Sequence, residues 1–285
     1  MKSLTDKLKQ HIHDMSHGAA LVGVASMDRF NGAPRGHHPS DFLAGARSVV
    51  AIALPIVSGL MNWHEYLEKS DVIKETDTHV GKEGARQPWS PRTVIRKHIE
   101  RRCCYEVINN ELQSLSMHGA IFLENAGYPS TYLPTTYGQT LSWPGNYQWD
   151  FPKPPQGFAP FSHRHAAVAA GLGAFGLNNL VLTRQYGPRQ RLVSVITAAP
   201  LDADGLVREP VCLGTKCSLC VKKCPARALG DTVEFVMAGQ KSMLAKVDIE
   251  ACRGYYKDSA LGSQCGRECM MCCPLAHGAG HKGKG

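Results

Sequence analysis

The sequence lacks a hydrophobic run long enough to cross a membrane. Its longest apolar stretch, residues 48–61, is interrupted by Pro55, whereas a spanning helix needs about 18–20 consecutive apolar residues. The first residues also lack the apolar segment of a secretory signal and the paired arginines of a twin-arginine signal. We therefore expect a cytoplasmic protein without membrane contact, in a compartment that keeps thiols reduced.

Aromatic residues (7%) and charged residues (20%) are both sparse, but 43% of the 285 residues are hydrophobic. This is enough apolar mass for one large domain or two small ones, and it excludes a disordered chain. The formal charge of +8 counts every cysteine as neutral. Two iron-sulfur clusters with thiolate ligands would each contribute about −2, so the basic charge gives little reason to expect nucleic acid.

Hydrophobic periodicity predicts a mixed α+β sandwich over residues 1–205. We expect a helix at residues 3–15, strands at 19–25 and 48–55, a long helix from 90 to 119, a short strand at 120–124, a small-residue helix at 163–171, and strands at 180–183 and 191–198. Residues 128–161 form a long irregular segment rich in proline and aromatic residues, which is typical of a functional loop. Residues 206–276 form a separate cysteine module, followed by a flexible tail at 277–285.

Cysteine is abundant, with eleven residues, nine of which lie between Cys212 and Cys273. Disulfides are hard to explain in the expected compartment, so metal ligation is the leading interpretation. The two remaining cysteines, Cys103 and Cys104, lie in the expected long helix without a partner at ligand spacing. We expect one of them to be buried as a small apolar side chain.

The nine cysteines form two groups that end in the same C-x3-C-P device. In this device the last cysteine reaches the other cluster. The sequence therefore predicts two 4Fe-4S clusters, one held by Cys212, Cys217, Cys220 and Cys273 and the other by Cys224, Cys252, Cys265 and Cys269. Cys272 is left over. Zinc is the alternative, although zinc ribbons favour paired C-x2-C motifs without the prolines.

The segment before the cysteine module carries a further set of motifs. These are Gly171-Leu172-Gly173, Gly176, Asn178, Tyr186-Gly187-Pro188 and Pro200-Leu201. Together with the cysteine groups they resemble the cobalamin-dependent iron-sulfur reductases, the superfamily of epoxyqueuosine reductases and reductive dehalogenases. The resemblance runs from about residue 4 to residue 274.

This resemblance implies a nitroreductase-like domain that binds base-off cobalamin, followed by a ferredoxin-like module with two clusters. The implied cofactor contacts are Gly171, Gly173, Gly176, Asn178, Tyr186, Gly187 and Arg191. We expect Gly171 and Gly173 to leave room for the flat corrin ring. The tRNA-gripping tail and the export signal of the two branches are not recognised, so tRNA is a disfavoured substrate and a small molecule is preferred. A low-potential donor such as ferredoxin or flavodoxin would supply electrons.

The proton donor has no defensible match, and the candidates are Asp150, Tyr147, His163 and His165. For the two histidines the structural alternative is a helix cap or a hydrogen bond to a loop carbonyl. Arg189 and Arg191 lie either at an exposed strand end or against corrin carboxamides or an anionic substrate. The basic run from Arg92 to Arg102 is interpreted as a solvated helix face, with docking of an acidic electron donor as the alternative.

Three functions are compatible with the residues. The first is a cobalamin-dependent reductase that removes oxygen, halogen or another leaving group from a small molecule. The second is a protein that carries or reduces a corrinoid for another protein. The third is a flavin-dependent iron-sulfur reductase on the same sandwich. The irregular segment 128–161 favours the enzyme, because it could cover a substrate pocket.

Overall fold

The computed structural model describes residues 2–61, 102–135, 161–258 and 267–277. Its central element is a four-stranded antiparallel sheet in the order β1-β2-β6-β3, formed by Leu21–Ser26, Ser48–Pro55, Gln190–Thr197 and Ser130–Tyr132. Strands β2 and β6 pair along their whole length, from Ser48 opposite Thr197 to Pro55 opposite Gln190. Both are rich in β-branched residues, which favour such strands.

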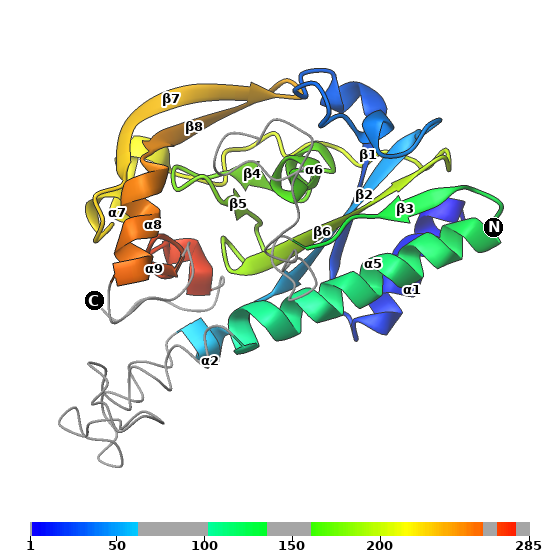
Figure 1. Cartoon of the computed structure of the whole chain (residues 1–285), viewed down its shortest axis with the longest axis horizontal. Helices are drawn as coiled ribbons and strands as arrows, with labels where there is room; N and C mark the ends of the chain where they lie inside the picture. Colours follow the sequence, from blue (N-terminus) through cyan, green and yellow to red (C-terminus); the bar gives the residue numbers. More distant parts are fainter. Residues whose placement is uncertain (1, 62–101, 136–160, 259–266, 278–285) are drawn as a thin grey trace, which may run out of the picture.

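The two faces of this sheet are covered by different helices (Figure 1). On one face, α1 (Leu4–Met15) and α5 (Ile108–Asn125) bury Leu8, Ile12 and Leu115 against the strands. On the other face, α6 (His163–Ala169) packs its alanines against Ala51 and neighbouring strand residues. Because alternate residues of a strand point to opposite faces, the apolar β2 strand contributes to both cores.

The long helix α5 continues where the sequence predicts a strand. Residues 120–124 belong to α5, so the predicted short strand there is wrong. The reason is Gly119, which we interpreted as a helix end. It is instead a contact point, since a Cβ there would lie 3.5 Å from Ile12 Cδ1 of α1. A Cβ at that distance would make an ordinary van der Waals contact, so the helix continues through Gly119 because the apolar face of α5 is buried on both sides of it, which outweighs the poor helix propensity of glycine.

A π-helical stretch, Arg102–Val107, leads into α5. Cys103 is exposed and Cys104 is half-buried, so the expectation that one of them is fully buried is wrong. The predicted helix from residue 90 to 101 lies outside the described residues, as does its basic run apart from Arg102.

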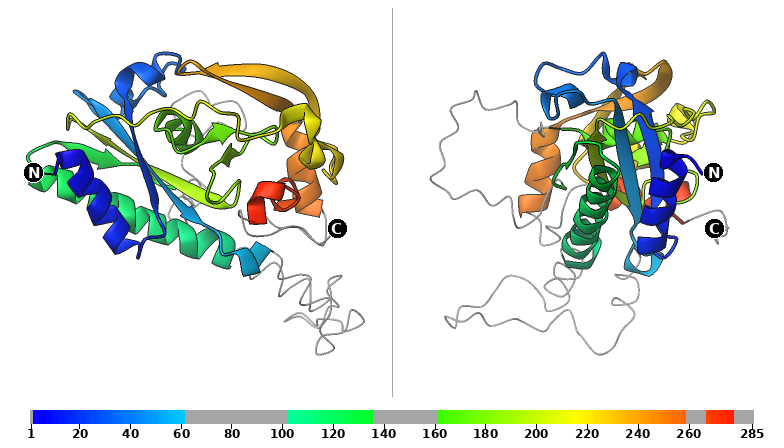
Figure 2. Two further views of the ribbon diagram at one scale, coloured as in Figure 1. Left: turned by 180° about the vertical axis from the view of Figure 1, so that it is seen from behind. Right: turned by 90° about the vertical axis from the view of Figure 1, so that its right-hand side faces the viewer.

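The largest element that the sequence analysis missed is a long β-hairpin in the cysteine region. Strands β7 (Leu229–Met237) and β8 (Gln240–Val247) pair antiparallel, with Ala238 and Gly239 at positive φ in the turn. Figure 2 shows this ribbon extending from the cysteine-bearing helices across the sandwich. Phe235, Met237 and Leu244 pack against the core on the α6 side of the sheet. The cysteine region is therefore in apolar contact with the sandwich.

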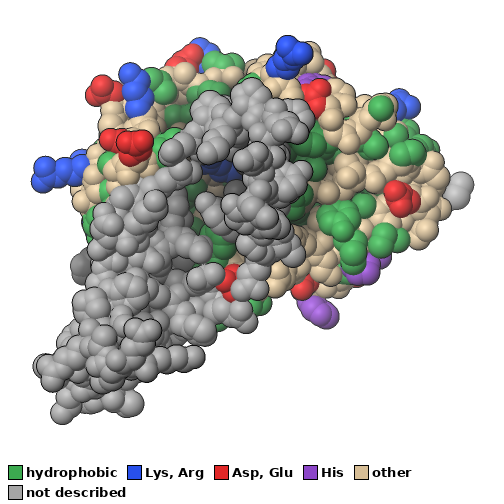
Figure 3. Space-filling view, in the orientation of Figure 1, with side chains coloured by type: hydrophobic (Ala, Val, Ile, Leu, Met, Phe, Trp, Pro, Cys, Tyr) green, Lys and Arg blue, Asp and Glu red, His purple; other side chains and the backbone are tan. Residues whose placement is uncertain are grey.

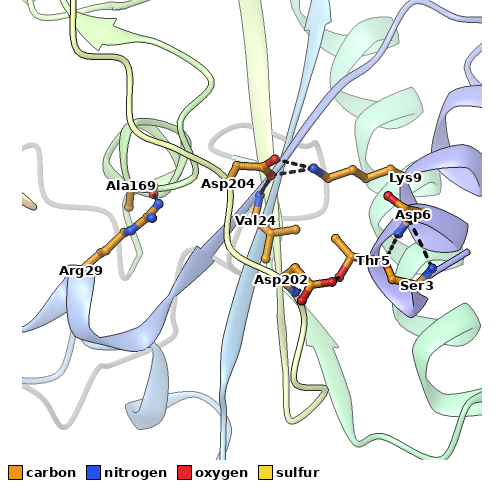
Figure 4. A network of polar contacts seen from close by, with 9 residues as sticks. All are labelled: Ser3, Thr5, Asp6, Lys9, Val24, Arg29, Ala169, Asp202 and Asp204. Carbon is orange, nitrogen blue, oxygen red and sulfur yellow. Dashed lines mark hydrogen bonds and ion pairs between the residues drawn. The ribbon is translucent and has the colours of Figure 1, made fainter.

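The stretch after β6 is tied to the N-terminus by a polar network (Figure 4). Both carboxylate oxygens of Asp204 accept hydrogen bonds from Lys9 Nζ, at 2.6 and 2.7 Å, and one also accepts from the Val24 backbone N–H at 2.7 Å. Asp202 and Thr5 exchange two further hydrogen bonds. These contacts hold the chain against α1 and β1 just before it enters the cysteine region.

Among its described residues, the cysteine region contains three α-helices besides the hairpin. Cys220 lies on α7 (Leu219–Lys222), Cys252 on α8 (Ile249–Asp258) and Cys269 on α9 (Arg267–Met271). Figure 1 shows these helices together at the end of the molecule away from α1. Across the described residues, every helix is too short or too polar to span a bilayer.

Candidate functional site

The thiols of the first cysteine group converge with the C-terminal cysteines. The thiol of Cys220 is influenced by the charges of Cys272, Cys212 and Cys273, which together with the larger effect of burial raise its pKa to about 11. Burial also raises the pKa of Cys273, with contributions from Cys212 and Cys217. Such mutual effects require proximity. The four predicted ligands of the first cluster thus lie in one region of the structure, although Cys273 is more than fifty residues from the others in sequence.

Cys272 also lies in this region. The charge of Cys272 has a larger effect on Cys220 than that of Cys212 or Cys273. Burial raises the pKa of Cys272 to about 11, the Cys273 charge adds to this increase, and the nearby Lys223 opposes it. The structure therefore does not separate Cys272 from Cys273, and the assignment of Cys273 as the ligand stays a prediction from the C-x3-C-P spacing.

The thiols are close without being arranged as ligands. Within the described ranges, no three Cys, His, Asp or Glu side chains are arranged to hold a metal ion. The fit to a cluster rests on donor chemistry, because several soft thiol groups gather at one place and backbone N–H groups are directed at two of the sulfurs. Gly214 N–H donates to Cys212 Sγ at 3.3 Å, and Ala228 N–H donates to Cys224 Sγ at 3.3 Å.

The hairpin brings two predicted ligands of the second cluster to the same end of the ribbon. Leu229 pairs with Val247, and Asp248 N–H donates to Ala228 O at 2.8 Å beyond that pair. Cys224 lies shortly before the hairpin and Cys252 shortly after it. The fourth predicted ligand of this set, Cys265, lies outside the described residues.

Leu177 of the glycine-rich segment inserts into the cysteine region. Its side chain is only 2% exposed and packs with Leu229 and Ala245, and half-buried cysteines of both groups surround this cluster. Its backbone N–H donates to Cys212 Sγ at 3.4 Å, and its carbonyl oxygen accepts from Ala245 N–H at 3.0 Å. The segment that the sequence analysis assigned to a cofactor therefore contacts the first cysteine group directly.

The next residue, Asn178, contacts the second cysteine group. Its Nδ2 donates to the Cys269 carbonyl oxygen at 2.9 Å, and its Oδ1 accepts from Leu180 N–H at 3.2 Å. Asn178 is 7% exposed, so the amide group is sequestered by the protein. The neighbouring Asn179, with φ of 62°, donates from Nδ2 to Ala245 O of β8 at 2.7 Å.

The Tyr186-Gly187 turn contacts the end of the cysteine region. A Cβ at Gly187 would lie 2.3 Å from Leu275 O, and Arg189 Nε donates to Ala276 O at 2.7 Å. Arg189 also donates through Nη1 to Ile56 O. Its guanidinium group is thus bound by the protein, which disagrees with the exposed strand end that was one of the two alternatives for Arg189. Tyr186 Oη donates to Ala19 O at 2.9 Å.

The glycines do not provide the open surface that the sequence analysis expected. A Cβ at Gly171 would lie 2.2 Å from Gly205 O, and one at Gly173 would lie 2.2 Å from Leu182 O. At Gly176 the nearest atom would be Leu182 Cδ1, at 2.7 Å. The missing side chains of Gly171 and Gly173 make room for the chain's own atoms, and the contact of these glycines with a corrin ring stays a prediction.

The two candidate histidines are hydrogen-bonded within the protein. His163 is buried, its Nε2 donates to Pro134 O at 2.9 Å and its Nδ1 is 3.0 Å from Ser194 Oγ. This is the hydrogen bond to a loop carbonyl that was the structural alternative. His165 Nδ1 is 2.6 Å from Ser162 Oγ, and its ring lies edge-on to Phe175 and Phe235. Burial lowers the pKa of each ring to about 4.

Arg191 lies over an aromatic ring. Its guanidinium carbon is 3.7 Å from the centre of the Tyr105 ring, and its Nε donates to Asn109 Oδ1 at 3.2 Å. The positive charge of Arg191 also contributes to the lowered pKa of His163. Thr135, which follows the His163 partner Pro134, is fully buried, and its hydroxyl has no hydrogen-bond partner among the described residues. Buried hydroxyls are normally bonded, so this one is available to a ligand group or water.

The remaining predicted proton donors, Tyr147 and Asp150, lie outside the described residues. The same applies to residues 136–160 of the irregular segment and to tail residues 278–285. Of the site residues that sequence reasoning missed, Leu177 had no signal of its own, because an apolar residue gives no indication that its N–H will be directed at a thiol.

Known proteins with similar sequences are reductive dehalogenases. No protein-family model matches the chain. Over 122 residues it is 31% identical to the tetrachloroethene reductive dehalogenase of Sulfurospirillum multivorans, a match that covers 39% of this chain and 23% of the relative. Over 68 residues it is 38% identical to an enzyme of the same name from Desulfitobacterium hafniense, covering 22% and 12%. The chain thus spans less than a quarter of the length of these curated relatives.

Solved structures match over nearly the whole chain. An epoxyqueuosine reductase with a modified tRNA stem loop aligns with a TM-score of 0.60 at 17% identity, covering 96% of this chain and 66% of that one. A reductive dehalogenase, described with a mechanism for B12-dependent dehalogenation, aligns with a TM-score of 0.56 at 19% identity, covering 93% and 31%. The resemblance to this superfamily is confirmed, and so is the mixed helix and strand architecture. The nitroreductase-like and ferredoxin-like descriptions and the domain boundaries stay predictions.

Proposed function

We propose that this chain is an iron-sulfur oxidoreductase that passes electrons through two 4Fe-4S clusters to a corrinoid, which reduces a small-molecule substrate. The observation that carries the proposal is the contact between the glycine-rich segment and both cysteine groups, through Leu177 to Cys212 and Asn178 to Cys269. The relatives are reductases in both sequence and structure. The two clusters, the corrinoid, the small-molecule substrate and the cytoplasmic location are all part of this proposal.

The protein residues would hold and tune the clusters. Cys212, Cys217, Cys220 and Cys273 are the proposed ligands of one cluster, and Cys224, Cys252, Cys265 and Cys269 of the other. Such clusters supply single-electron transfer when bound. The N–H groups of Leu177 and Gly214 would stabilise the charge on Cys212, and that of Ala228 the charge on Cys224. Hydrogen bonds to sulfur are among the factors that set cluster potential.

Support for the corrinoid comes from the relatives and from one residue. The reductive dehalogenase of similar fold is described as B12-dependent, and the unpaired hydroxyl of Thr135 is a buried polar group that a ligand would complete. The glycine positions add nothing to this case, because their free space is filled by the chain itself. A flavin on the same fold is the outcome that would replace the corrinoid.

The first experiment is anaerobic reconstitution with iron and sulfide, followed by metal and sulfide analysis. We expect about eight iron and eight sulfide per chain. Stoichiometric zinc, or four or fewer iron atoms, would contradict two clusters. The loaded protein is then titrated with cob(II)alamin and followed by electron paramagnetic resonance. Loss of the nitrogen splitting from the lower base supports base-off binding, whereas no binding at micromolar concentration together with bound flavin contradicts it.

A turnover assay separates an enzyme from a corrinoid carrier. The loaded protein, titanium(III) citrate and a panel of halogenated phenols are combined, and halide release is measured. Catalytic release supports a reductase with its own organic substrate. Reduction of bound cobalamin without release from any member of the panel, combined with transfer of the corrinoid to a second protein, supports the carrier instead.

A further inference from the structure

The glycine-rich segment contacts both cysteine groups through two consecutive residues. Leu177 donates its backbone N–H to Cys212 Sγ, and Asn178 donates its side-chain amide to the Cys269 carbonyl oxygen. Leu177 and Asn178 are adjacent and both buried, so the two contacts are made from one short, packed stretch of chain. The two cysteine groups, which are far apart in sequence, therefore both contact the same short stretch of chain.

The Asn178 amide makes a hydrogen bond at each of its two ends. One end is used by Cys269 O and the other by Leu180 N–H, and the side chain is buried. A partly buried carbonyl that loses a hydrogen-bond donor is destabilised. The Cys269 carbonyl oxygen, on the short helix α9, also lies 3.8 Å from the Cys272 thiol, but at 2.9 Å the Asn178 amide is the shorter contact and the one that ties α9 to the glycine-rich segment.

We infer that Asn178 is a positioning residue for the cluster that includes Cys269, and that it acts by fixing the backbone of α9 rather than by touching a cofactor. This inference rests on the proposed function. It differs from the role that the resemblance implied for Asn178, which was contact with cobalamin.

The test replaces one atom. Asn178→Asp keeps the oxygen that accepts from Leu180 N–H but turns the donor to Cys269 O into an acceptor. The matched control is Asn179→Asp, which makes the same chemical change one residue later and removes a contact to Ala245 O on the hairpin. Each protein is reconstituted, and iron content and the midpoint potential of each cluster are measured by redox titration with paramagnetic resonance.

We expect Asn178→Asp to lose about four of eight irons or to shift one cluster's potential, with the second cluster and the Asn179→Asp protein unchanged. If Asn178→Asp is insoluble, Asn178→Ala removes the same hydrogen bond without a buried charge and is judged by the same measurements. Identical iron content and potentials in the Asn178 and Asn179 variants overturn the inference. If the wild-type protein binds no cluster, the proposed function itself fails, which is a separate outcome.

A second inference comes from surface charge. The stretch between Glu209 and Asp231 contains no acidic residue. It presents four exposed basic side chains and an exposed leucine, Leu213, at 68% exposure. The four are Lys216, Lys222, Lys223 and Arg227. We refer to these five residues as the basic face. Figure 3 shows Lys and Arg side chains protruding at the end of the molecule where Figure 1 draws α7, with Asp and Glu side chains between them.

This face borders the thiols of the first cysteine group. Its residues alternate in sequence with Cys217, Cys220 and Cys224, which are half-buried, and Lys223 lies close enough to Cys272 to act on its charge. Among the described residues, acidic groups also lie at this end: the exposed Glu209 and Asp231 bound the stretch, Asp248 and Glu250 are exposed at the start of α8, and Glu268 lies on α9. Electron-transfer complexes use small interfaces with charge complementarity, which speeds encounter.

We propose that the basic face docks an acidic, low-potential electron-transfer protein beside the first cluster. This second proposal also rests on the proposed function. The test measures the rate at which a reduced acidic ferredoxin reduces the loaded protein at low and high salt. The variant is Lys216→Glu with Lys222→Glu, and the control is Lys2→Glu with Lys7→Glu, an equal charge change on exposed residues at the other end of the chain.

We expect the rate with ferredoxin to fall at least tenfold in the basic-face variant at low salt and to depend less on salt. The control should keep the wild-type rate. Reduction by dithionite in 0.5 M salt (about a 4 Å screening length) should be equal in all three proteins, which shows that the clusters are intact. Equal ferredoxin rates in the variant and the control overturn the proposal.

Discussion

Gly187 lies directly against Leu275, since a Cβ at Gly187 would stand 2.3 Å from the Leu275 carbonyl oxygen. Gly187 also has φ of 56°, a conformation that side chains disfavour. Leu275 follows Cys273 by two residues, so this contact sets the position of the chain that leaves the predicted cluster ligand. The Tyr-Gly-Pro turn thus has a structural reason that does not involve a cofactor.

The first prediction concerns this contact. Gly187→Ala should reduce the free energy of unfolding by about 3 kcal/mol or more, because backbone atoms must move in addition to the φ strain. Gly36→Ala is the control, since Gly36 also has positive φ but a Cβ there would meet nothing within 4 Å. The control should cost only about 1 kcal/mol. Urea unfolding measures both, and equal costs would contradict the packing argument.

The second prediction separates the adjacent cysteines. Cys273→Ala should lose about four of eight irons after reconstitution, whereas Cys272→Ala should keep all of them. The reason is the C-x3-C-P spacing, which selects Cys273. Iron analysis of the two variants decides the question. If only Cys272→Ala loses iron, Cys272 and not Cys273 is the ligand. The comparison is needed because Cys272 also lies close to Cys220.

The third prediction concerns acid stability. Burial lowers the pKa of His163 to about 4, below its ordinary value of 6.5. The unfolded chain therefore binds a proton more readily, and stability from this group is present above pH 6.5 and is lost as the pH falls toward 4. The loss is about 2 kcal/mol between pH 7 and pH 5. In His163→Gln, urea unfolding should show a smaller difference between these two pH values than in the wild type.

The fourth prediction compares two ion pairs. Asp204 pairs with Lys9 and also accepts the Val24 backbone N–H, whereas Glu209 pairs only with the exposed Arg184. Asp204→Ala should cost about 1–3 kcal/mol, because it leaves a strand N–H unpaired. Glu209→Ala should cost less than about 0.5 kcal/mol, as is usual for exposed pairs. Thermal or urea unfolding would contradict this prediction if the two variants were equally stable.

Helices and strands of the sandwich were predicted correctly from the sequence in segments where one residue type or one periodicity dominates. Strand β2 matches residues 48–55 because a continuous β-branched run ends at a proline. The small-residue helix α6 and strand β6 also agree with their predicted positions to within two residues. The end of α5 was mispredicted at Gly119, because a single sequence does not distinguish a glycine that ends a helix from one inside a helix at a contact with another helix.

The candidate site was less predictable, because its contacts join distant segments. The spacing of the cysteines identified the thiols, and the structure brings those of the first group together. The amide of Asn178 was assigned to a cofactor because its motif resembled a cofactor-binding family, but its partner is a backbone carbonyl 91 residues away in sequence. No local pattern specifies such a partner. The hairpin was missed because Ala-Gly is a weak turn sequence.

Because of the hairpin, the relative positions of Cys224 and Cys252 do not depend on the length of the chain between them. Since its two strands leave and return at the same end, residue pairs added at or removed from the turn would lengthen or shorten the ribbon without moving Cys224 relative to Cys252. What such changes would alter is the far end, where Phe235 covers the ring of His165. Insertions and deletions at the turn of this ribbon are therefore compatible with an unchanged arrangement of Cys224 and Cys252.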